Sequence, residues 1–153
     1  MELTDIKSLD LDELTEYIVS LGEPKFRAKQ LYEWMHVRLV PGYDEMTNIP
    51  ASLKAKLKEN TFYASLYPER VQVSKEDGTS KYLFRLHDGN YIESVLMHYH
   101  HGDSVCISSQ AGCRMGCRFC ASTLDGLARN LYPSEMLDQI SVSYTHLTLP
   151  TKL

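Results

Sequence analysis

All four cysteines of the 153-residue chain lie in one stretch, Cys106-Ile-Ser-Ser-Gln-Ala-Gly-Cys113-Arg-Met-Gly-Cys117-Arg-Phe-Cys120. The last three follow the spacing C-x3-C-x2-C, and two nearby glycines allow the backbone to curl around a ligand. Three soft thiolates this close together favour an iron–sulfur cluster or zinc. Structural zinc sites prefer four ligands, usually in two separated pairs. We therefore favour a cluster held by three cysteines, with one iron open to a further ligand.

The charges around these cysteines agree with an anionic ligand. Arg114 and Arg118 lie between the thiols, and no acidic residue occurs from Ser104 to Leu124. Cationic side chains stabilise thiolates and would also contact an RNA phosphate. The structural alternative is a set of buried or zinc-bound cysteines without a redox role.

Composition narrows the class of protein. Sixteen Lys and Arg against twenty Asp and Glu give a net charge of −4, with 43% hydrophobic and 24% charged residues. These values are typical of a soluble globular protein of one domain or two small ones. No apolar run reaches the roughly 18 residues of a membrane span, and the first residues do not form a signal peptide. We expect a cytoplasmic protein, neither a disulfide scaffold nor a uniformly basic nucleic-acid binder.

The first 65 residues predict a helical domain. Ser8 or Asp10 can cap a first helix that ends at Gly22, Pro24 suits the start of a second helix, and a third begins near Pro50. Each helix is too short to be stable alone, so we expect the three to pack together. The residues with helical spacing are Leu11, Leu14, Ile18, Leu21, Ala28, Leu31, Tyr32, Met35, Leu53 and Leu57.

From about Pro68 the pattern changes to strands. Four segments rich in β-branched, aromatic and aliphatic residues predict an antiparallel meander. The pairs Asp77-Gly78 and Asp88-Gly89 suit tight hairpin turns between the first three strands. We expect the fourth strand to lead directly into the cysteine loop. The predicted strands are residues 70–74, 81–86, 91–97 and 104–109.

A further helix is predicted to begin at Pro133, with Glu135, Met136 and Ile140 on its pattern. Residues 141–153 contain no acidic residue and several threonines, and they do not continue the helical stripe. We interpret this segment as a non-native tail.

Four motifs together indicate a family: Gly22-Glu-Pro-Lys-Phe-Arg-Ala-Lys-Gln-Leu-Tyr-Glu-Trp-Met-His36, Tyr91-Ile-Glu-Ser-Val95, Cys106–Cys113 and Phe119-Cys-Ala-Ser122. With the cysteine triplet, the chain resembles the bacterial dual-specificity adenine-C2 methyltransferases of 23S ribosomal RNA and transfer RNA, in the radical S-adenosylmethionine superfamily. The resemblance implies an α+β fold. Residues 1–65 would be a helical accessory domain and 66–103 a β meander. Residues 104–140 would be the first strand, cluster loop and helix of a truncated partial (β/α) barrel.

The resemblance also implies site residues. Cys113, Cys117 and Cys120 would bind a [4Fe–4S] cluster, and Phe119 would lie at the S-adenosylmethionine site. Cys106 matches a cysteine that resolves a protein–RNA cross-link, and Glu93 matches the proton acceptor. On a strand face with Tyr91, Val95 and Met97, we expect Glu93 to lie in an apolar setting that raises the pKa of its carboxyl group.

The implied partners are 23S rRNA, tRNA and an electron-donor protein, with S-adenosylmethionine as cofactor, no membrane and a monomeric enzyme. A disulfide bond is a further implied feature of the family. The family's mechanism needs five cysteines and this chain has four, so we expect a truncated enzyme that does not turn over by itself. Two alternatives remain open: an adenine-C8 rRNA methyltransferase of the same superfamily, and a non-catalytic RNA-binding module with a structural metal.

Overall fold

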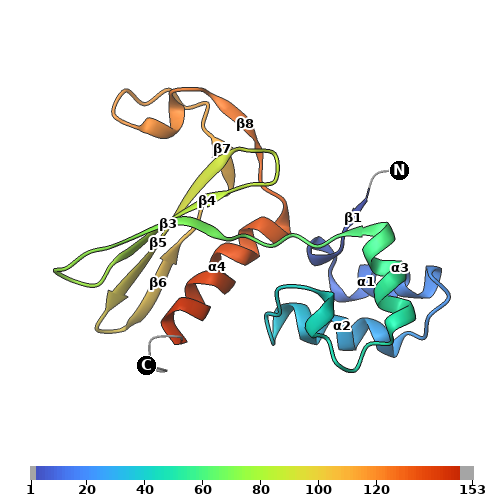
Figure 1. Cartoon of the computed structure of the whole chain (residues 1–153). Helices are drawn as coiled ribbons and strands as arrows, with labels where there is room; N and C mark the ends of the chain where they lie inside the picture. The colour runs from blue at the N-terminus through green and yellow to red at the C-terminus, as the bar shows by residue number, and fades with distance from the viewer. Residues whose placement is uncertain (1–2, 149–153) are drawn as a thin grey trace. The chain divides into compact units, whose positions relative to one another are not determined.

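The computed structural model describes residues 3–148, of which side chains 146–148 are not described (Figure 1). The chain divides into two compact units, Met1–Ser65 and Leu66–Leu153. The first is mainly helical and the second combines sheets with one long helix, so the protein mixes helices and sheets. Within residues 3–148 no helix has the length and apolar character needed to cross a membrane.

The first unit contains the three predicted helices, which are confirmed as α1 (Leu11–Ser20), α2 (Phe26–His36) and α3 (Ala51–Asn60). Two 3-10 turns, η1 (Ile6–Ser8) and η2 (Tyr43–Glu45), and a short parallel pair of β1 (Thr4–Asp5) with β2 (Thr61–Phe62) complete it. Asp10 caps α1, because its side chain accepts from the Glu13 amide at 2.8 Å while the Glu13 carboxylate accepts from the Asp10 amide at 2.9 Å.

The core of the first unit follows the helical spacing read from the sequence except at Leu11, which is exposed. Each helix turns two or three apolar side chains inward, and the segment between α2 and α3 adds others. This burial stabilises helices that are individually too short to persist in water. Its buried members are Ile6, Leu14, Ile18, Ala28, Leu31, Met35, Tyr43, Met46, Ile49, Leu53 and Leu57.

The second unit begins with the predicted antiparallel meander, which is confirmed. Its strands are β3 (Pro68–Val73), β4 (Ser80–Arg85), β5 (Tyr91–Tyr99) and β6 (Gly102–Cys106), hydrogen-bonded in sequence order. Gly78 and Gly89 have φ of +73° and +86° in the first two turns, as expected for the two Asp-Gly pairs. Tyr82, Phe84, Ile92 and Leu96 pack with residues near α4 to form the core.

The region after β6 differs from the predicted single strand. β6 ends at Cys106 rather than Ser109, and β7 (Gln110–Gly112) pairs antiparallel with β8 (Leu127–Asn130) in a separate sheet. The cysteine loop, residues 113–126, including the 3-10 turn η3 (Ala121–Thr123), is thus enclosed by a small hairpin (Figure 1). Between strand β6 and helix α4, where one strand, the cluster loop and a helix were expected, the chain thus adds the β7–β8 hairpin.

The final helix, α4 (Pro133–Thr148), is longer than the sequence pattern indicated. The expected loss of helical structure after Ile140 is wrong, because the hydroxyls of Ser141, Ser143 and Thr145 each donate to the carbonyl four residues earlier. Such hydrogen bonds satisfy polar side chains inside a helix. Ile140 is exposed and not on the core face, whereas Glu135 is buried. Residues 149–153 of the predicted tail lie outside the described residues.

Candidate functional site

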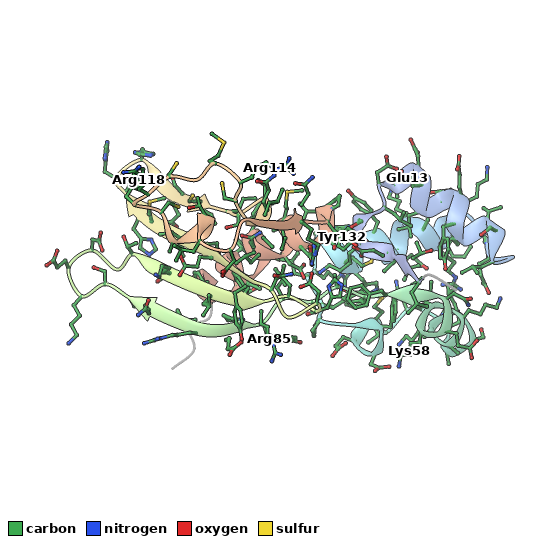
Figure 2. All side chains as sticks on the ribbon, turned by 90° about the horizontal axis from the view of Figure 1, so that it is seen from above. Glu13, Lys58, Arg85, Arg114, Arg118 and Tyr132 are labelled. Atoms are coloured by element: carbon green, nitrogen blue, oxygen red, sulfur yellow. The ribbon has the colours of Figure 1, made fainter. Side chains whose placement is uncertain are left out.

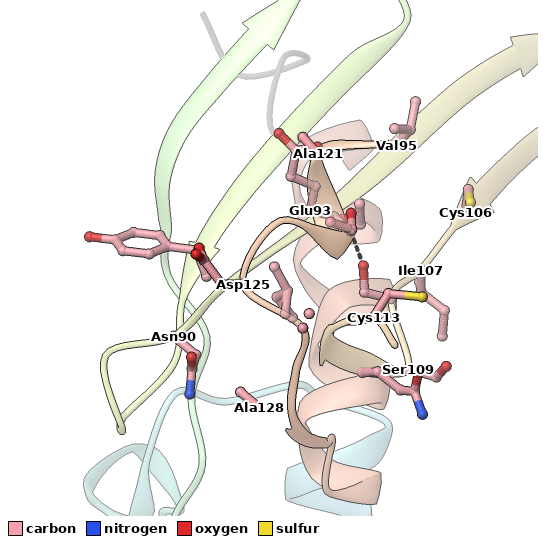
Figure 3. Close-up of a pocket in the computed structure, with 18 of the residues that line it drawn as sticks. Asn90, Glu93, Val95, Cys106, Ile107, Ser109, Cys113, Ala121, Asp125 and Ala128 are labelled. Carbon is pink, nitrogen blue, oxygen red and sulfur yellow. Dashed lines mark hydrogen bonds between the residues drawn. The ribbon is translucent and has the colours of Figure 1, made fainter. Parts of the chain in front are cut away.

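A pocket of about 700 Å³ is lined by the sheet on one side and by the cysteine loop on the other (Figure 3). β5 supplies Glu93 and Val95, the end of β6 supplies Cys106, and the loop supplies Cys113. Three of the residues selected from the sequence therefore share one cavity. The remaining lining residues are Gly89, Asn90, Tyr91, Ile92, Ser94, Ile107, Ser108, Ser109, Gln110, Gly112, Ala121, Ser122, Asp125, Gly126 and Ala128.

The strand register places the side chains on this side of the sheet. Val95 is the direct partner of Cys106, so both project from the same face, and Glu93 follows two residues away on that face. The alternate residues Ile92, Ser94 and Leu96 are buried on the opposite face. The core packing of one face thus presents Glu93 and Cys106 to the pocket.

The environment of Glu93 is not the apolar one that we expected. Its side chain is 54% exposed, and its carboxylate forms an ion pair with the Lys81 ammonium at 3.1 Å. The strand alternation did group Glu93 with Val95, but among the described residues this face of the sheet is not covered by an apolar layer. Glu93 is therefore a solvated, paired carboxylate in this chain.

The four cysteines are all free, so the implied disulfide bond is not supported. Cys106 and Cys117 are exposed, and Cys113 and Cys120 are half-buried. Cys113 lines the pocket, whereas Cys117 and Cys120 do not. Within residues 3–148, no three His, Cys, Asp or Glu side chains converge closely enough to hold a metal ion.

The donor set nevertheless fits an iron–sulfur cluster. Three free thiols lie within eight consecutive residues of one exposed loop, and soft thiolates are the ligands such clusters use. The side chains of Arg114 and Arg118 extend from the same loop into solvent (Figure 2). Phe119 is 94% exposed and does not line the pocket. The loop thus carries ligands of the right type, but within residues 3–148 their side chains do not converge on one point.

Hydrogen bonds to backbone carbonyls define the shape of this loop. The Thr123 hydroxyl donates to the carbonyls of Cys117 and Cys120, at 3.2 and 3.1 Å. At the loop's base, the Cys113 amide donates to the Gly126 carbonyl at 3.0 Å. These bonds fold residues 113–126 into a closed turn. The three thiols therefore lie on backbone segments that are next to one another.

An ion network with the buried Glu135 at one end anchors the hairpin that carries the loop. The Arg129 guanidinium on β8 binds both oxygens of Glu135 on α4, each at 2.8 Å, and Asp88 in the β4–β5 turn at 2.5 Å. Burial alone would raise the pKa of both carboxyl groups, but the hydrogen bonds from Arg129 and from backbone amides outweigh it. The pKa of Asp88 falls to about 2, and that of Glu135 is also lowered.

This network predicts an acid-dependent loss of stability. A carboxyl group whose folded pKa is lowered stabilises the fold fully above its unfolded pKa, and this contribution disappears as the pH falls through the folded pKa. For Asp88 that window runs from 3.8 down to about 2. We expect Arg129→Met to lower the urea midpoint at neutral pH and to flatten its fall across this window, because Asp88 and the buried Glu135 both lose their guanidinium partner. Arg70→Met, at an exposed strand position, is the control, and an equal effect there would contradict the assignment.

Comparison with known proteins shows which proteins this chain is similar to. A family model described as the ribosomal RNA large subunit methyltransferase N-terminal domain matches residues 4–62. A probable dual-specificity RNA methyltransferase RlmN of Lachnospira eligens is 68% identical over 138 residues, which are 90% of this chain and 39% of that protein. Another of the same description, from Lachnoclostridium phytofermentans, is 59% identical over 91% of this chain and 39% of its own length.

The chain is similar to RlmN proteins over nine tenths of its length. It spans about two fifths of the length of the curated relatives that it matches. A radical SAM methyltransferase from Sphaerobacter thermophilus has the same fold over 97% of this chain and 44% of its own, with a TM-score of 0.86 and 39% identity. RlmN proteins are named as enzymes, so the family's activity is catalytic.

Sequence reasoning missed the polar residues that support the site. Gln139 and Ser143 on α4 are fully buried, and Asp138 and Glu135 nearly so. A helix whose inward face is polar was not visible as an amphipathic pattern, since the usual signal is an apolar stripe. The spacing of Glu135 and Gln139, one helical turn apart, was the available indication.

Proposed function

We propose that the chain contributes the cluster-binding loop and part of the RNA-modifying pocket of a methyltransferase that acts on C2 of adenine in 23S rRNA and tRNA. The observation that carries this proposal is that Glu93, Cys106 and Cys113 share one pocket in a chain similar to RlmN proteins. Residues 104–140 would form the start of the radical SAM core, after the helical domain and the meander.

In this proposal Cys113, Cys117 and Cys120 hold a [4Fe–4S] cluster, and Phe119 lies beside S-adenosylmethionine. When bound, these groups supply the radical chemistry that an unreactive adenine carbon requires. The protein positions the base and excludes water. The Cys106 thiol lies on the pocket side of the sheet, where it can resolve a covalent link between protein and RNA. The Glu93 carboxylate, now paired with Lys81, would accept a proton from the modified base.

The target base must leave its stack to enter such a pocket, which favours an RNA loop or single strand. Transfer of the methyl group in the family's mechanism also needs a fifth cysteine, and this chain has four. We therefore expect no turnover from this chain alone. An electron-donor protein is a further proposed partner of the complete enzyme.

Anaerobic reconstitution of this chain with iron and sulfide tests the cluster assignment. We expect a brown protein with a [4Fe–4S] spectrum that S-adenosylmethionine alters, since one iron is left open. The second candidate is an RNA-binding module with a structural metal, since four free thiols in one stretch would also suit zinc. It predicts a colourless protein that binds one zinc and no iron–sulfur cluster.

The carbon of adenine that receives the methyl group, C2 or C8, requires a separate experiment. A complete methyltransferase that carries these residues is expected to produce 2-methyladenosine, identified by chromatography and mass spectrometry of digested RNA. Detection of 8-methyladenosine instead would support the C8 alternative and leave the cluster assignment intact.

A further inference from the structure

The chain between β6 and β7 passes from one sheet to another, and its backbone needs new partners there. The β5–β6 ladder ends at the pair Val95–Cys106, and β7 begins at Gln110. Buried or half-buried amides and carbonyls left without partners destabilise a fold. Residues 107–109 also line the pocket. The hydrogen-bond partners of their backbone therefore determine the shape of the site.

Gln139 of α4 supplies the missing partner. Its side-chain carbonyl accepts from the Ser108 amide at 2.9 Å, and its amide donates to the Ser108 carbonyl, also at 2.9 Å. The same amide nitrogen donates to the Glu135 carbonyl at 3.3 Å. Gln139 is 0% exposed. One side chain thus reproduces the paired hydrogen bonds that a neighbouring strand would make.

Ser108, which Gln139 holds in place, is in turn hydrogen-bonded to Glu93. Continuing the β5–β6 register beyond Cys106 would place Ser108 opposite Glu93. There the Ser108 hydroxyl donates to the Glu93 backbone carbonyl at 2.6 Å, drawn as a dashed line in Figure 3. The pairing therefore continues through a side chain after the backbone ladder has ended.

We propose that Gln139 is a positioning residue, which acts through Ser108 to fix the spacing of Glu93 and Cys106 in the pocket. This inference rests on the proposed function, because it assigns both groups to the reaction. Only glutamine has the required donor and acceptor at this reach: glutamate lacks the donor, and asparagine is shorter by one methylene. Catalytic groups displaced by about 1 Å can lose about 100-fold in rate.

The first test uses this chain and measures backbone hydrogen exchange at Ser108. Gln139→Leu is expected to accelerate exchange of the Ser108 amide about tenfold or more, because its acceptor is lost. Gln139→Glu keeps the acceptor and should accelerate it less. Asp138→Asn is the matched control: Asp138 is the adjacent buried residue on α4, and its carboxylate accepts from the Leu66 amide at 3.1 Å instead. Unchanged exchange at Ser108 in Gln139→Leu would overturn the proposal.

The second test uses a complete methyltransferase that carries these residues, and it applies Ser108→Ala in case Gln139→Leu does not fold. Ser108→Ala keeps both backbone bonds to Gln139 and removes only the link to Glu93. We expect kcat to fall about tenfold with KM for RNA unchanged, because the affected groups act in the chemical steps. An unchanged kcat, or a loss confined to KM, would refute the positioning role. Absence of methylation in the unmodified enzyme would instead refute the proposed function and leave the exchange result standing.

Discussion

Cys117→Ala is expected to abolish iron and sulfide uptake by this chain under anaerobic reconstitution, and to abolish RNA methylation in a complete enzyme. Three thiolates are the minimum that can hold a cubane cluster with one iron open, so the loss of any one leaves too few ligands. Cys113→Ala and Cys120→Ala should behave in the same way. Iron and sulfide per chain, with the visible absorption spectrum, provide the measurement.

Cys106→Ala is the matched control for this series, since it removes the one remaining thiol of the same stretch. Cys106 lines the pocket but is the last residue of β6 and lies outside the loop. Its replacement should leave iron uptake unchanged while methylation in the complete enzyme is lost. If Cys106→Ala reduced iron uptake as much as Cys117→Ala, the division between ligands and catalytic thiol would be wrong.

The elements that the sequence predicted well are those whose signals are local and repeated. Leu14 and Ile18 in α1 recur at the helical period, and Tyr82 and Phe84 in β4 recur at the period of a strand. Asp-Gly pairs mark the first two turns of the meander because their glycines adopt positive φ. The presence of Glu93 and Val95 on one face follows from the same alternation.

The parts that escaped prediction depend on contacts between distant segments. β7 and β8 have three and four residues, too few to show an alternation, and fourteen residues separate them. Arg129 and Glu135 resemble ordinary surface charges in the sequence, yet they form a part-buried pair in which Glu135 is almost fully buried. The prediction of an apolar setting for Glu93 was wrong, because the neighbours of a residue on its own strand do not determine what covers that strand.

Gly112→Ala is expected to have the largest effect on stability of any single methyl addition in the cysteine loop or its hairpin. Gly112 has φ of +75°, and a Cβ there would lie 2.1 Å from the Gly126 carbonyl oxygen. Because that atom belongs to the backbone of the opposite end of the loop, it cannot rotate away. Strain from the left-handed conformation and from overpacking together predict a loss of about 3–5 kcal/mol in the free energy of unfolding.

Gly116→Ala separates the two causes of that loss. Gly116 also has a positive φ, +70°, but a Cβ there would meet no atom within 4 Å. Its replacement should therefore cost only the conformational term, about 1–2 kcal/mol. Urea unfolding of both variants gives the comparison, and equal losses would show that the close approach of Gly112 to Gly126 is not what closes the loop. Because the Cys113 amide binds the same Gly126 carbonyl, Gly112→Ala should also lower iron uptake more than Gly116→Ala, which connects the hairpin's backbone geometry to the position of the first cluster ligand.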